Sequence, residues 1–355
     1  MTRHHLSAIA VAAAALTFFA CADQVSAPVA VRSFSGGAAL VSLTPEKLIS
    51  GSMANSVNDK GDAVGYGLGA VCGTRGLPRL WRADGTMVNL PVGTHCGGNA
   101  TVISNSGYIA GPLYSPDAMA LWTPNTSGGY DLQELEPANG RQLNITGIND
   151  AGEIVASYMP INGKVPEIYY RTPSSTSWTA VQAPAGATTC QFGGINNNGA
   201  FIGYCYVNGA PLTGYLWANH DATPTQLPRP ATTNNVFVKD ISDAGVVAGF
   251  IGDCAVMRAL RWTLSDGVYK VEILPDPGKG ASATSVSSNG TVAGGVYKGG
   301  GTNSTATVWA SWGGYQLLPL IGKSSQSSGS GDITTTSAGA TIVVGSQDGQ
   351  AVRWK

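Results

Sequence analysis

Histidine is the residue that most often acts as a general acid or base in enzymes, and this 355-residue chain has only four. His4 and His5 fall in an apolar N-terminal leader, which leaves His95 and His220. His220 follows Trp217 in a polar turn and is interpreted as solvated. A Ser-His-Asp triad would need one of these two, and no Gly-x-Ser-x-Gly motif accompanies them. We therefore predict no catalytic residue.

Motifs for cofactors and metals are equally weak. The run Gly299-Gly300-Gly301 lacks the Lys-Ser/Thr of a phosphate-binding loop. The Asn/Asp-rich turns resemble fragments of calcium loops, but no Asp-x-Asp-x-Asp-Gly run occurs. His95, Cys96 and Cys72 match no zinc signature, and oxidation of the two thiols competes with metal binding. Acidic pairs such as Asp266 and Glu272 are not placed at the separation that glycosidases use. We predict no cofactor and no metal.

A repeat organises the chain instead. Its turn glycines are Gly61, Gly107, Gly152, Gly199, Gly245, Gly290 and Gly339. Their spacings, by subtraction, are 46, 45, 47, 46, 45 and 49 residues. Asn, Asp and Ser precede each glycine, as in Asn149-Asp150, and an aliphatic residue usually stands four positions before it. Such residues favour tight turns, since Asn and Asp bond their own backbone and Gly adopts positive φ. Each copy therefore predicts a β-hairpin.

The rest of each copy predicts two further strands. One large aromatic ends the third strand: Trp81, Trp122, Tyr170, Trp217, Trp262, Trp309 and Trp354. A fourth strand follows and stops near a proline, which cannot donate to a strand ladder. The aromatic recurs at one phase, so we expect it to pack between neighbouring copies.

Four short antiparallel strands every 45 residues or so are typical of a propeller blade. The fold class is therefore all-β: a seven-bladed β-propeller of four-stranded antiparallel blades over residues 38–355. The seventh copy ends at Trp354-Lys355 without a fourth strand. We predict that the segment Ala38 to Pro45 supplies that strand beside Ala351 to Lys355 and closes the ring, which removes two open sheet edges.

The repeated motif Ile-Asn-x-x-Gly-x-Val-Val-Gly, with Trp downstream, resembles the HAF repeats of bacterial extracellular proteins. The resemblance covers roughly residues 50 to 355. The His-Ala-Phe tripeptide of that family is replaced here by pairs such as Arg79-Leu80 and Ala120-Leu121. The resemblance implies an exported protein and carries over no catalytic residue.

The N-terminus predicts export. Residues 1–21 read as a signal peptide, with Arg3 before the apolar run Leu6 to Ala20. Cys21 is a lipidation candidate, and the alternative is ordinary cleavage after Ala22 or Ala27. Residues 22–37 are then a tether rich in small residues. The expected location is the cell envelope, as an outer-membrane lipoprotein, or the extracellular medium.

The remaining cysteines suit an oxidising compartment. Cys190 lies six residues before Asn196, and Cys205 lies six after Gly199, so the two should face each other across one hairpin and form a disulfide. Cys72 and Cys96 fall in loops that share one face of a propeller, so this pair is the second candidate. Cys254 is left over, and an odd thiol could form an intermolecular bridge.

Charge and composition narrow the partners. Charged residues make up 12% of the chain and the net charge is −1. No Lys/Arg cluster appears, which excludes nucleic acid, and membrane contact is expected only through the lipid anchor. We expect a monomer.

Binding is expected on the propeller face with the longer loops, because loops on a rigid scaffold often carry function. The candidate contact residues are Arg75, His95, Tyr114, Arg141, Tyr206, Asp253, Arg258 and Lys298.

Two functions remain open. The first is a non-catalytic binding or scaffold module for a protein or glycan partner. The second is a secreted carbohydrate-active hydrolase or lyase with its site at the central channel. Two or three carboxylates or a metal in the channel would favour the enzyme, and an uncharged channel lined by Gly and Ser would favour the binding module.

Overall fold

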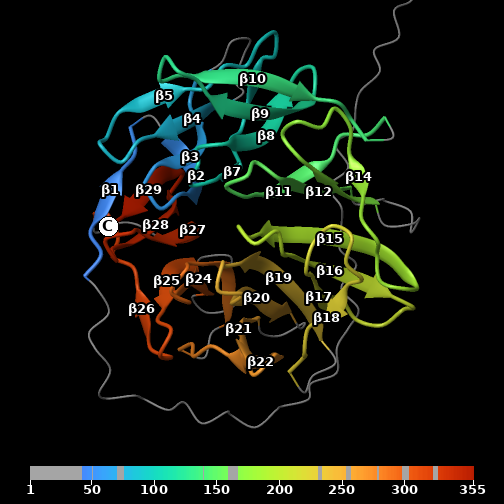
Figure 1. Ribbon diagram of the computed structural model, residues 1–355. Coiled ribbons are helices and arrows are strands. Elements are labelled where there is room, and N and C mark those ends of the chain that lie inside the picture. The colour runs from blue at the N-terminus through green and yellow to red at the C-terminus, as the bar shows by residue number, and fades with distance from the viewer. Residues whose placement is uncertain are drawn as a thin grey trace, which may run out of the picture. The chain divides into compact units, whose positions relative to one another are not determined.

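The repeat of about 45 residues folds into seven antiparallel sheets arranged as a ring, and no helix occurs in the ranges below (Figure 1). The computed structural model describes residues 42–49, 51–69, 76–138, 140–158, 167–230, 234–252, 257–277, 280–297, 304–322 and 327–355. The predicted signal peptide, Cys21 and the tether lie outside these ranges. In the described part, no helix is long and apolar enough to cross a bilayer.

The first three blades follow one another along the chain. Blade one contains β2 (Gly51–Val57), β3 (Ala63–Gly67), β4 (Leu77–Trp81) and β5 (Met87–Asn89). Blade two contains β6 (Gly97–Gly98), β7 (Val102–Ile103), β8 (Ile109–Tyr114), β9 (Ala118–Pro124) and β10 (Tyr130–Leu135). Its innermost strand is split, because β6 and β7 both pair with β8. Blade three contains β11 (Asn144–Ile148), β12 (Ile154–Tyr158), β13 (Glu167–Arg171) and β14 (Thr179–Ala180).

The last four blades keep the same order from the axis outward. Blade four contains β15 (Ala187–Ile195), β16 (Phe201–Val207), β17 (Thr213–Trp217) and β18 (Thr225–Gln226). Blade five contains β19 (Asn235–Ile241), β20 (Val247–Gly252), β21 (Arg258–Ser265) and β22 (Val268–Ile273). Blade six contains β23 (Ala281–Val286), β24 (Val292–Tyr297), β25 (Ser304–Trp309) and β26 (Tyr315–Leu317). Blade seven contains β27 (Ser328–Thr335), β28 (Thr341–Gln347), β29 (Gln350–Trp354) and β1 (Pro45–Lys47). The chain is a seven-bladed β-propeller.

Blade seven joins the two ends of the ring, as predicted. Strand β1 pairs with β29, with Pro45 opposite Trp354. Thr44 and Lys355 exchange two backbone hydrogen bonds of 2.8 and 3.1 Å. The closing strand begins at Pro45, whereas the prediction ended it there. Glu46 and Lys47 continue the strand, and the Glu46 carboxylate accepts a hydrogen bond from Arg353.

The tight turn of blade seven corrects the sequence alignment. Gly345 follows the turn glycine Gly339 by six residues, whereas Gly249 follows Gly245 by four. The β-bulge before Asp332 matches the bulge before Asp240 in blade five. Ile333, and not Thr335, therefore occupies the aliphatic position of this repeat, and the hairpin is longer at its turn.

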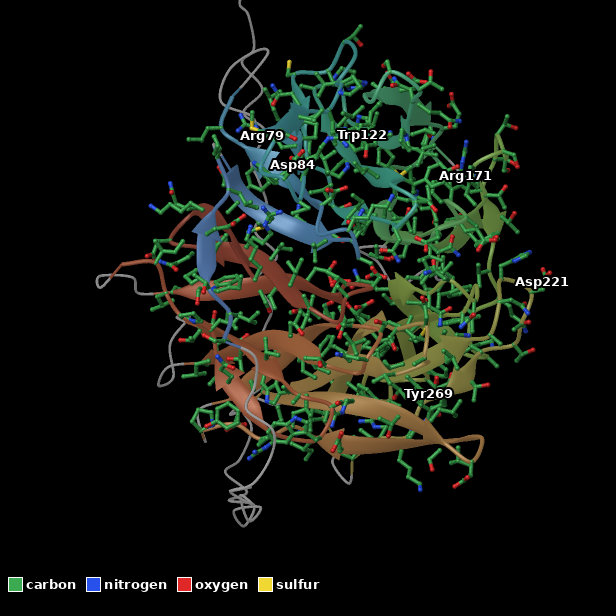
Figure 2. All side chains as sticks on the ribbon, turned by 60° about the vertical axis from the view of Figure 1, so that its left-hand side comes forward. Arg79, Asp84, Trp122, Arg171, Asp221 and Tyr269 are labelled. Carbon is green, nitrogen blue, oxygen red and sulfur yellow. A yellow bond between two sulfur atoms is a disulfide. The ribbon has the colours of Figure 1, made fainter. Side chains whose placement is uncertain are left out.

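The repeated tryptophan packs between blades, as expected, and also bonds them. All six are at most 1% exposed, and Figure 2 shows Trp122 inside the ring between blades one and two. Each indole N–H donates to a carbonyl just after the outer strand of the preceding blade, at 2.7 to 2.9 Å: Trp81 to Ile49, Trp122 to Pro91, Trp217 to Gln182, Trp262 to Pro228, Trp309 to Pro275 and Trp354 to Pro319. Blade three corrects the prediction for Tyr170: Arg171 pairs with Ile154 as Trp217 pairs with Phe201, so Arg171 takes the tryptophan position. The indole of Trp178 donates to the Glu136 carbonyl there instead.

The hydrophobic core is divided among the seams between blades. The seam between blades one and two, for example, buries Leu80 and Ile109 against Trp122. Such a core buries apolar surface of both neighbours at every seam. The ring therefore holds its inner strands at fixed positions around the axis.

Candidate functional site

The inner strands of all seven blades surround a cavity of about 280 Å³ on the ring axis. Its lining runs from the β-bulge of each inner strand to the first tight turn, so the cavity lies at the tight-turn end of the channel. Hydroxyl and amide side chains dominate the wall: Asn55, Ser56, Thr101, Ser104, Asn105, Thr146, Asn196, Asn197, Ser242, Thr284, Ser285, Ser287, Ser288 and Thr334. The charged members are Asp59, Asp150, Lys239, Asp240, Asp243 and Asp332.

The tight turns form a hydrogen-bonded belt at the cavity mouth. Within one turn, the Asn149 side-chain oxygen accepts from the backbone N–H groups of Ala151 and Glu153, and Gly152 has a φ of +75°. Between turns, a backbone N–H of one blade donates to a side-chain oxygen of the next: Asp59 to Asn105, Asn105 to Asp150, Asp150 to Asn197 and Asn197 to Asp243, at 2.6 to 2.8 Å. The repeated Asn and Asp residues are therefore structural, as the hairpin interpretation predicted.

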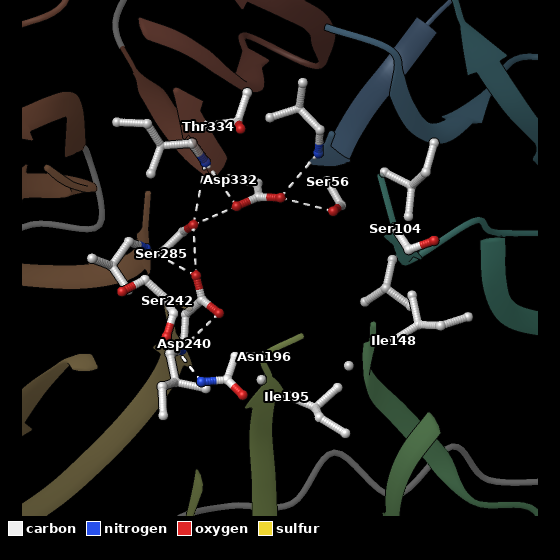
Figure 3. A pocket seen from close by; sticks show the side chains of 18 of the residues that line it. Ser56, Ser104, Ile148, Ile195, Asn196, Asp240, Ser242, Ser285, Asp332 and Thr334 are labelled. Carbon is white, nitrogen blue, oxygen red and sulfur yellow. Dashed lines mark hydrogen bonds between the residues drawn. The ribbon is translucent and has the colours of Figure 1, made fainter. Parts of the chain in front are cut away.

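Two carboxylates lie together on one side of the cavity wall. Asp240 in blade five and Asp332 in blade seven flank Ser285 in blade six, and the Ser285 hydroxyl is within hydrogen-bond reach of both (Figure 3). That hydroxyl carries one proton, so it donates to one carboxylate at a time. The three residues occupy the equivalent position after the bulge in their inner strands.

Each carboxylate is also held by its own and the next blade. Asp240 accepts from the backbone N–H groups of Ile241 (2.8 Å) and Val286 (2.9 Å). Asp332 accepts from the backbone N–H groups of Ile333 (2.7 Å) and Val57 (2.9 Å). The Ser56 hydroxyl donates to Asp332 at 2.7 Å. These bonds tie blade five to six and blade seven to one.

Burial and, to a smaller extent, the neighbouring charge of Asp332 raise the pKa of the Asp240 carboxyl to about 6, against the hydrogen bonds that lower it. Burial likewise raises the pKa of Asp332. Both side chains keep part of their surface on the cavity. Like charges this close favour a state in which one carboxyl holds a proton.

The opposite wall of the cavity is made of smaller groups. Val102, Gly147 and Gly194 take the places that the carboxylates and serines take in other blades. A Cβ on Gly194 would lie 2.5 Å from an Asp240 carboxylate oxygen, so a glycine is required there. At this position of the inner strands, blades five and seven thus carry carboxylates, and blades two, three and four carry none.

A channel with carboxylates was expected for an enzyme, and an uncharged channel for a binding module. The observed channel has features of both. It contains a carboxylate pair, yet hydrogen-bond donors of the ring occupy both oxygens of each carboxylate. A general base must be free to take a proton from its substrate. Among the described residues, no group of three or more His, Cys, Asp and Glu side chains is arranged to hold a metal ion.

The predicted binding residues lie at the other end of the strands. Tyr114 ends β8, Tyr206 is near the end of β16 and is 40% exposed, and Arg258 begins β21. Arg141 pairs with Glu167 at 2.9 Å. None of these residues lines the central cavity, and their role in binding stays a prediction. Arg75, Asp253 and Lys298 lie outside the described residues.

His95 differs from the other candidates because it is only 2% exposed. Its Nδ1 donates to the Pro116 carbonyl (2.6 Å), and its Nε2 lies 3.1 Å from the Glu134 carboxylate. It thus joins the first blade-to-blade connection to blade two. His220, predicted to be solvated, instead stacks on Tyr170 with ring centroids 4.3 Å apart.

The cysteine predictions are confirmed where the structure describes them. Cys190 and Cys205 are opposite each other in β15 and β16 and form a disulfide, with 4.1 Å between Cα atoms. Cys96 is also disulfide-bonded. Its predicted partner Cys72 lies outside the described residues, as does Cys254.

Comparison with known proteins supports the fold. Virginiamycin B lyase from Staphylococcus aureus is similar in structure at 14% identity, with a TM-score of 0.54 over 88% of this chain and 98% of that chain. A TolB-type protein from Agrobacterium tumefaciens gives a TM-score of 0.51 at 15% identity, over 76% of this chain and 94% of that chain. Puromycin hydrolase gives 0.58 at 13% identity, over 83% of this chain and 49% of that chain. No family model and no curated protein sequence matches. At these identities the likeness shows the fold alone.

Sequence reasoning missed the channel carboxylates. Asp240 stands five residues before Gly245, where blades one and six have Ser56 and Ser285. The recurrence of Ser or Asp at this one position of the repeat could have predicted that oxygen atoms line the channel. Asp332 was hidden, because the longer hairpin of blade seven moves it out of phase with its turn glycine.

Proposed function

We propose that this protein is an exported cell-envelope β-propeller that acts as a non-catalytic binding module for a protein or glycan partner. The observation that carries the proposal is the hydrogen bonding of the Asp240 and Asp332 carboxylates. Their oxygens accept hydrogen bonds from the ring itself, so they stabilise the scaffold and shape a polar wall. Fixed polar groups on a rigid scaffold reduce the entropy lost on binding.

Export is supported by the cysteine chemistry. Disulfides form and persist in oxidising compartments such as the periplasm and the extracellular medium. The Cys190–Cys205 bond and the bonded state of Cys96 fit such a compartment. The predicted signal peptide over residues 1–21 and the resemblance to HAF repeats point the same way.

One observation favours the alternative, a carbohydrate-active hydrolase or lyase working in the channel. Burial raises the pKa of Asp240 to about 6, and carboxyl groups with raised pKa values are common among catalytic acids. The oxygens of Asp240 already accept up to three hydrogen bonds from the ring, so such an enzyme would have to use the acceptor capacity that remains.

The test combines binding with turnover. Purified protein is applied to a glycan array and used to pull partners from envelope extracts, and mass spectrometry of its N-terminus reports cleavage and lipid. The proposal expects a specific ligand that is recovered unchanged, and a mature chain that begins either at a lipidated Cys21 or after Ala22 or Ala27. Product formation that is lost in Asp240→Asn would establish the enzyme instead, and an intact N-terminus would contradict export.

A further inference from the structure

The seam between blades six and seven differs from the equivalent seams on either side. Near the tight-turn face, each third strand presents one side chain to the next blade, directly before the repeated aromatic in most blades. These side chains are Leu80, Leu121, Tyr170, Leu216, Arg261, Val308 and Arg353. Val308 is the smallest of the seven.

Arginine fills the seam between blades five and six. The Arg261 guanidinium donates to the carbonyls of Gly290 (3.2 Å), Ala310 (2.9 Å) and Ser311 (2.9 Å). Its Nε lies 2.5 Å from Glu272, the residue opposite it in the outer strand. Arg261 is only 4% exposed, so it occupies the interior of the seam.

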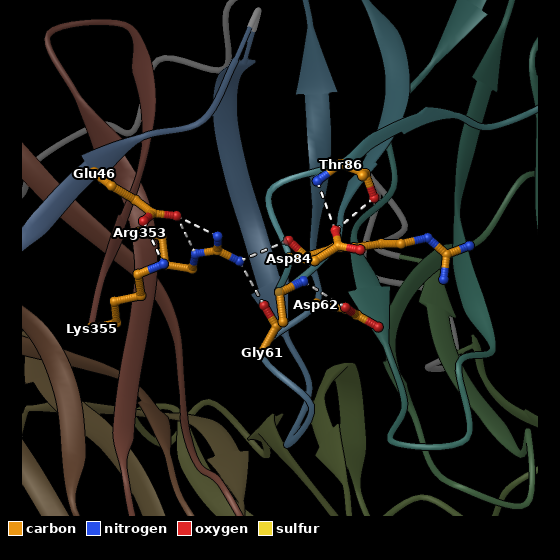
Figure 4. A network of polar contacts seen from close by, with 9 residues as sticks. Glu46, Gly61, Asp62, Asp84, Thr86, Arg353 and Lys355 are labelled. Carbon is orange, nitrogen blue, oxygen red and sulfur yellow. Dashed lines mark hydrogen bonds and ion pairs between the residues drawn. The ribbon is translucent and has the colours of Figure 1, made fainter.

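The seam between blades seven and one repeats this arrangement (Figure 4). Arg353 donates to the carbonyls of Gly61 (2.9 Å) and Arg82 (3.2 Å) and pairs with Glu46. Glu46 is again the residue opposite the arginine in the outer strand. A buried arginine, an outer-strand glutamate and a turn carbonyl thus form one motif, which the chain uses twice.

Blade six lacks both charges of this motif. Val308 replaces the arginine, and Gln316, its partner across the strands, replaces the glutamate. A cavity of about 200 Å³ lies here, lined by Val308, Gln316, Gly339 and Trp312 among others. In the described part of the chain, no side chain donates to the Gly339 carbonyl, whereas Gly61 and Gly290 each accept from an arginine. A Cβ on Gly339 would meet nothing within 4 Å.

Trp312 supplies an aromatic ring at this cavity. It lies in the turn between β25 and β26, is 45% exposed, and lines the cavity. The far end of its indole crosses Gly314, where an added Cβ would lie 2.1 Å from the ring. Asn289 and Ser311 add amide and hydroxyl groups to the same wall, and none of the residues that line the cavity is charged.

We infer that the cavity between blades six and seven binds one neutral sugar residue. The inference rests on the proposed binding function and names its site and ligand class. The apolar face of a sugar ring packs on Trp312, and its hydroxyls pair with Gln316, Asn289 and the Gly339 carbonyl. A neutral ligand is required because both charges of the arginine–glutamate motif are absent and a lone buried charge is costly. The volume is below the roughly 300–1,000 Å³ of pockets that enclose drug-sized ligands, so one ring fits and a longer glycan extends outward.

The two neighbouring seams show how this cavity can be filled by substitution, and we call the filled protein the plug variant. The double substitution Val308→Arg with Gln316→Glu introduces the motif that fills both neighbouring seams. Isothermal titration with N-acetylglucosamine, galactose and mannose measures binding, and glucosamine and glucuronate are the charged controls. Trp312→Ala removes the aromatic ring and Gly314→Ala displaces it, and the control Leu264→Ala removes an exposed apolar side chain from blade five.

The inference predicts that at least one neutral sugar binds and that the charged sugars bind more weakly. The plug variant should lose binding with an unchanged or raised melting temperature, and Trp312→Ala should weaken binding by about tenfold. Leu264→Ala should bind like the wild type. Binding of sugar by the folded plug variant, or failure of all three sugars to bind, overturns the inference. A protein or glycan partner that binds the plug variant normally leaves the proposed function intact, whereas a chain that binds no partner at all refutes both.

Discussion

At the scale of single residues, Asp240 has two roles that no sequence motif marks. Its carboxylate closes the seam between blades five and six through the N–H of Val286. It also places negative charge on the wall of the channel. Ser285 in blade six and Ser56 in blade one, at the same position, provide hydrogen bonds without that charge.

The raised pKa of Asp240 predicts a pH-dependent stability. A carboxyl with a pKa of about 6 when folded, and about 4 when unfolded, binds more protons in the folded state between these values. Its contribution to the free energy of unfolding therefore falls as pH rises from about 4 to about 6, by at most about 1.4 kcal/mol per pH unit. Urea denaturation across this range should show that the difference between wild type and Asp240→Asn changes with pH.

The control for this prediction is Leu264→Ala, because Leu264 is 50% exposed in β21 and has no titratable group. Its difference from wild type should be flat over the same range. A flat difference for Asp240→Asn as well would contradict the assignment of a raised pKa.

The disulfide gives a second prediction at this scale. Cys190 and Cys205 are 15 residues apart and fully buried. Replacing both with alanine should lower the free energy of unfolding by about 3 kcal/mol, because the unfolded chain gains freedom. Denaturant titration measures the change, and an equal stability would show that the bond contributes nothing.

The Cys190–Cys205 pair was predictable because symmetry about a tight turn fixes which residues face each other. The carboxylate pair was not, because Asp240 and Asp332 are 92 positions apart by subtraction and meet only because the inner strands of blades five, six and seven surround one axis. The cavity between blades six and seven was harder still to predict, because the sequence does not show that Val308 leaves unfilled the space that arginine fills in blades five and seven.

At the scale of elements, the repeated tryptophan and the proline-terminated outer strand work together. The indole N–H satisfies a carbonyl that follows the outer strand of the preceding blade, as in the 2.8 Å bond from Trp262 to Pro228. A sequence pattern of Trp and Pro predicted packing and strand ends, but the bond between them required coordinates. Blade three, with Arg171 at the tryptophan position, makes the bond from Trp178, which directly precedes β14.

Trp262→Phe tests this bond. Phenylalanine keeps most of the ring volume but cannot donate, so the Pro228 carbonyl loses its partner. The free energy of unfolding should fall by about 1–3 kcal/mol, measured by denaturant titration. Trp312→Phe, at an exposed ring, should change stability by less than about 0.5 kcal/mol. Equal effects of the two substitutions would count against the bond as a stabilising element.

At the scale of the whole molecule, closure depends on strands from opposite ends of the chain. The repeat period predicted this closure, because a seventh copy without a fourth strand needs one from elsewhere. The location of β1 was displaced toward the C-terminus of the predicted segment. The pairing of Glu46 with Arg353 fixes the register of β1 against β29, and an alignment of the repeats could not predict it.

Arg353→Met should destabilise the ring more than Arg261→Met does. Both arginines are buried and pair with an outer-strand glutamate. In blade five the two strands are joined by a short turn, whereas β1 and β29 are held together without a covalent connection. Loss of Arg353 should cost about 3–5 kcal/mol and promote aggregation, as measured by denaturant titration and size-exclusion chromatography. Equal losses from the two substitutions would show that closure is not the weak point of the ring.

The most direct test of the account is a mass spectrum of the ligand that the protein captures, taken before and after prolonged incubation with the purified ring. A binding module predicts recovery of the ligand with its mass and linkages unchanged, at one ligand per chain for a sugar held in the seam between blades six and seven. A shorter glycan, or an unsaturated product of a lyase, would contradict the central claim that this propeller binds without catalysis.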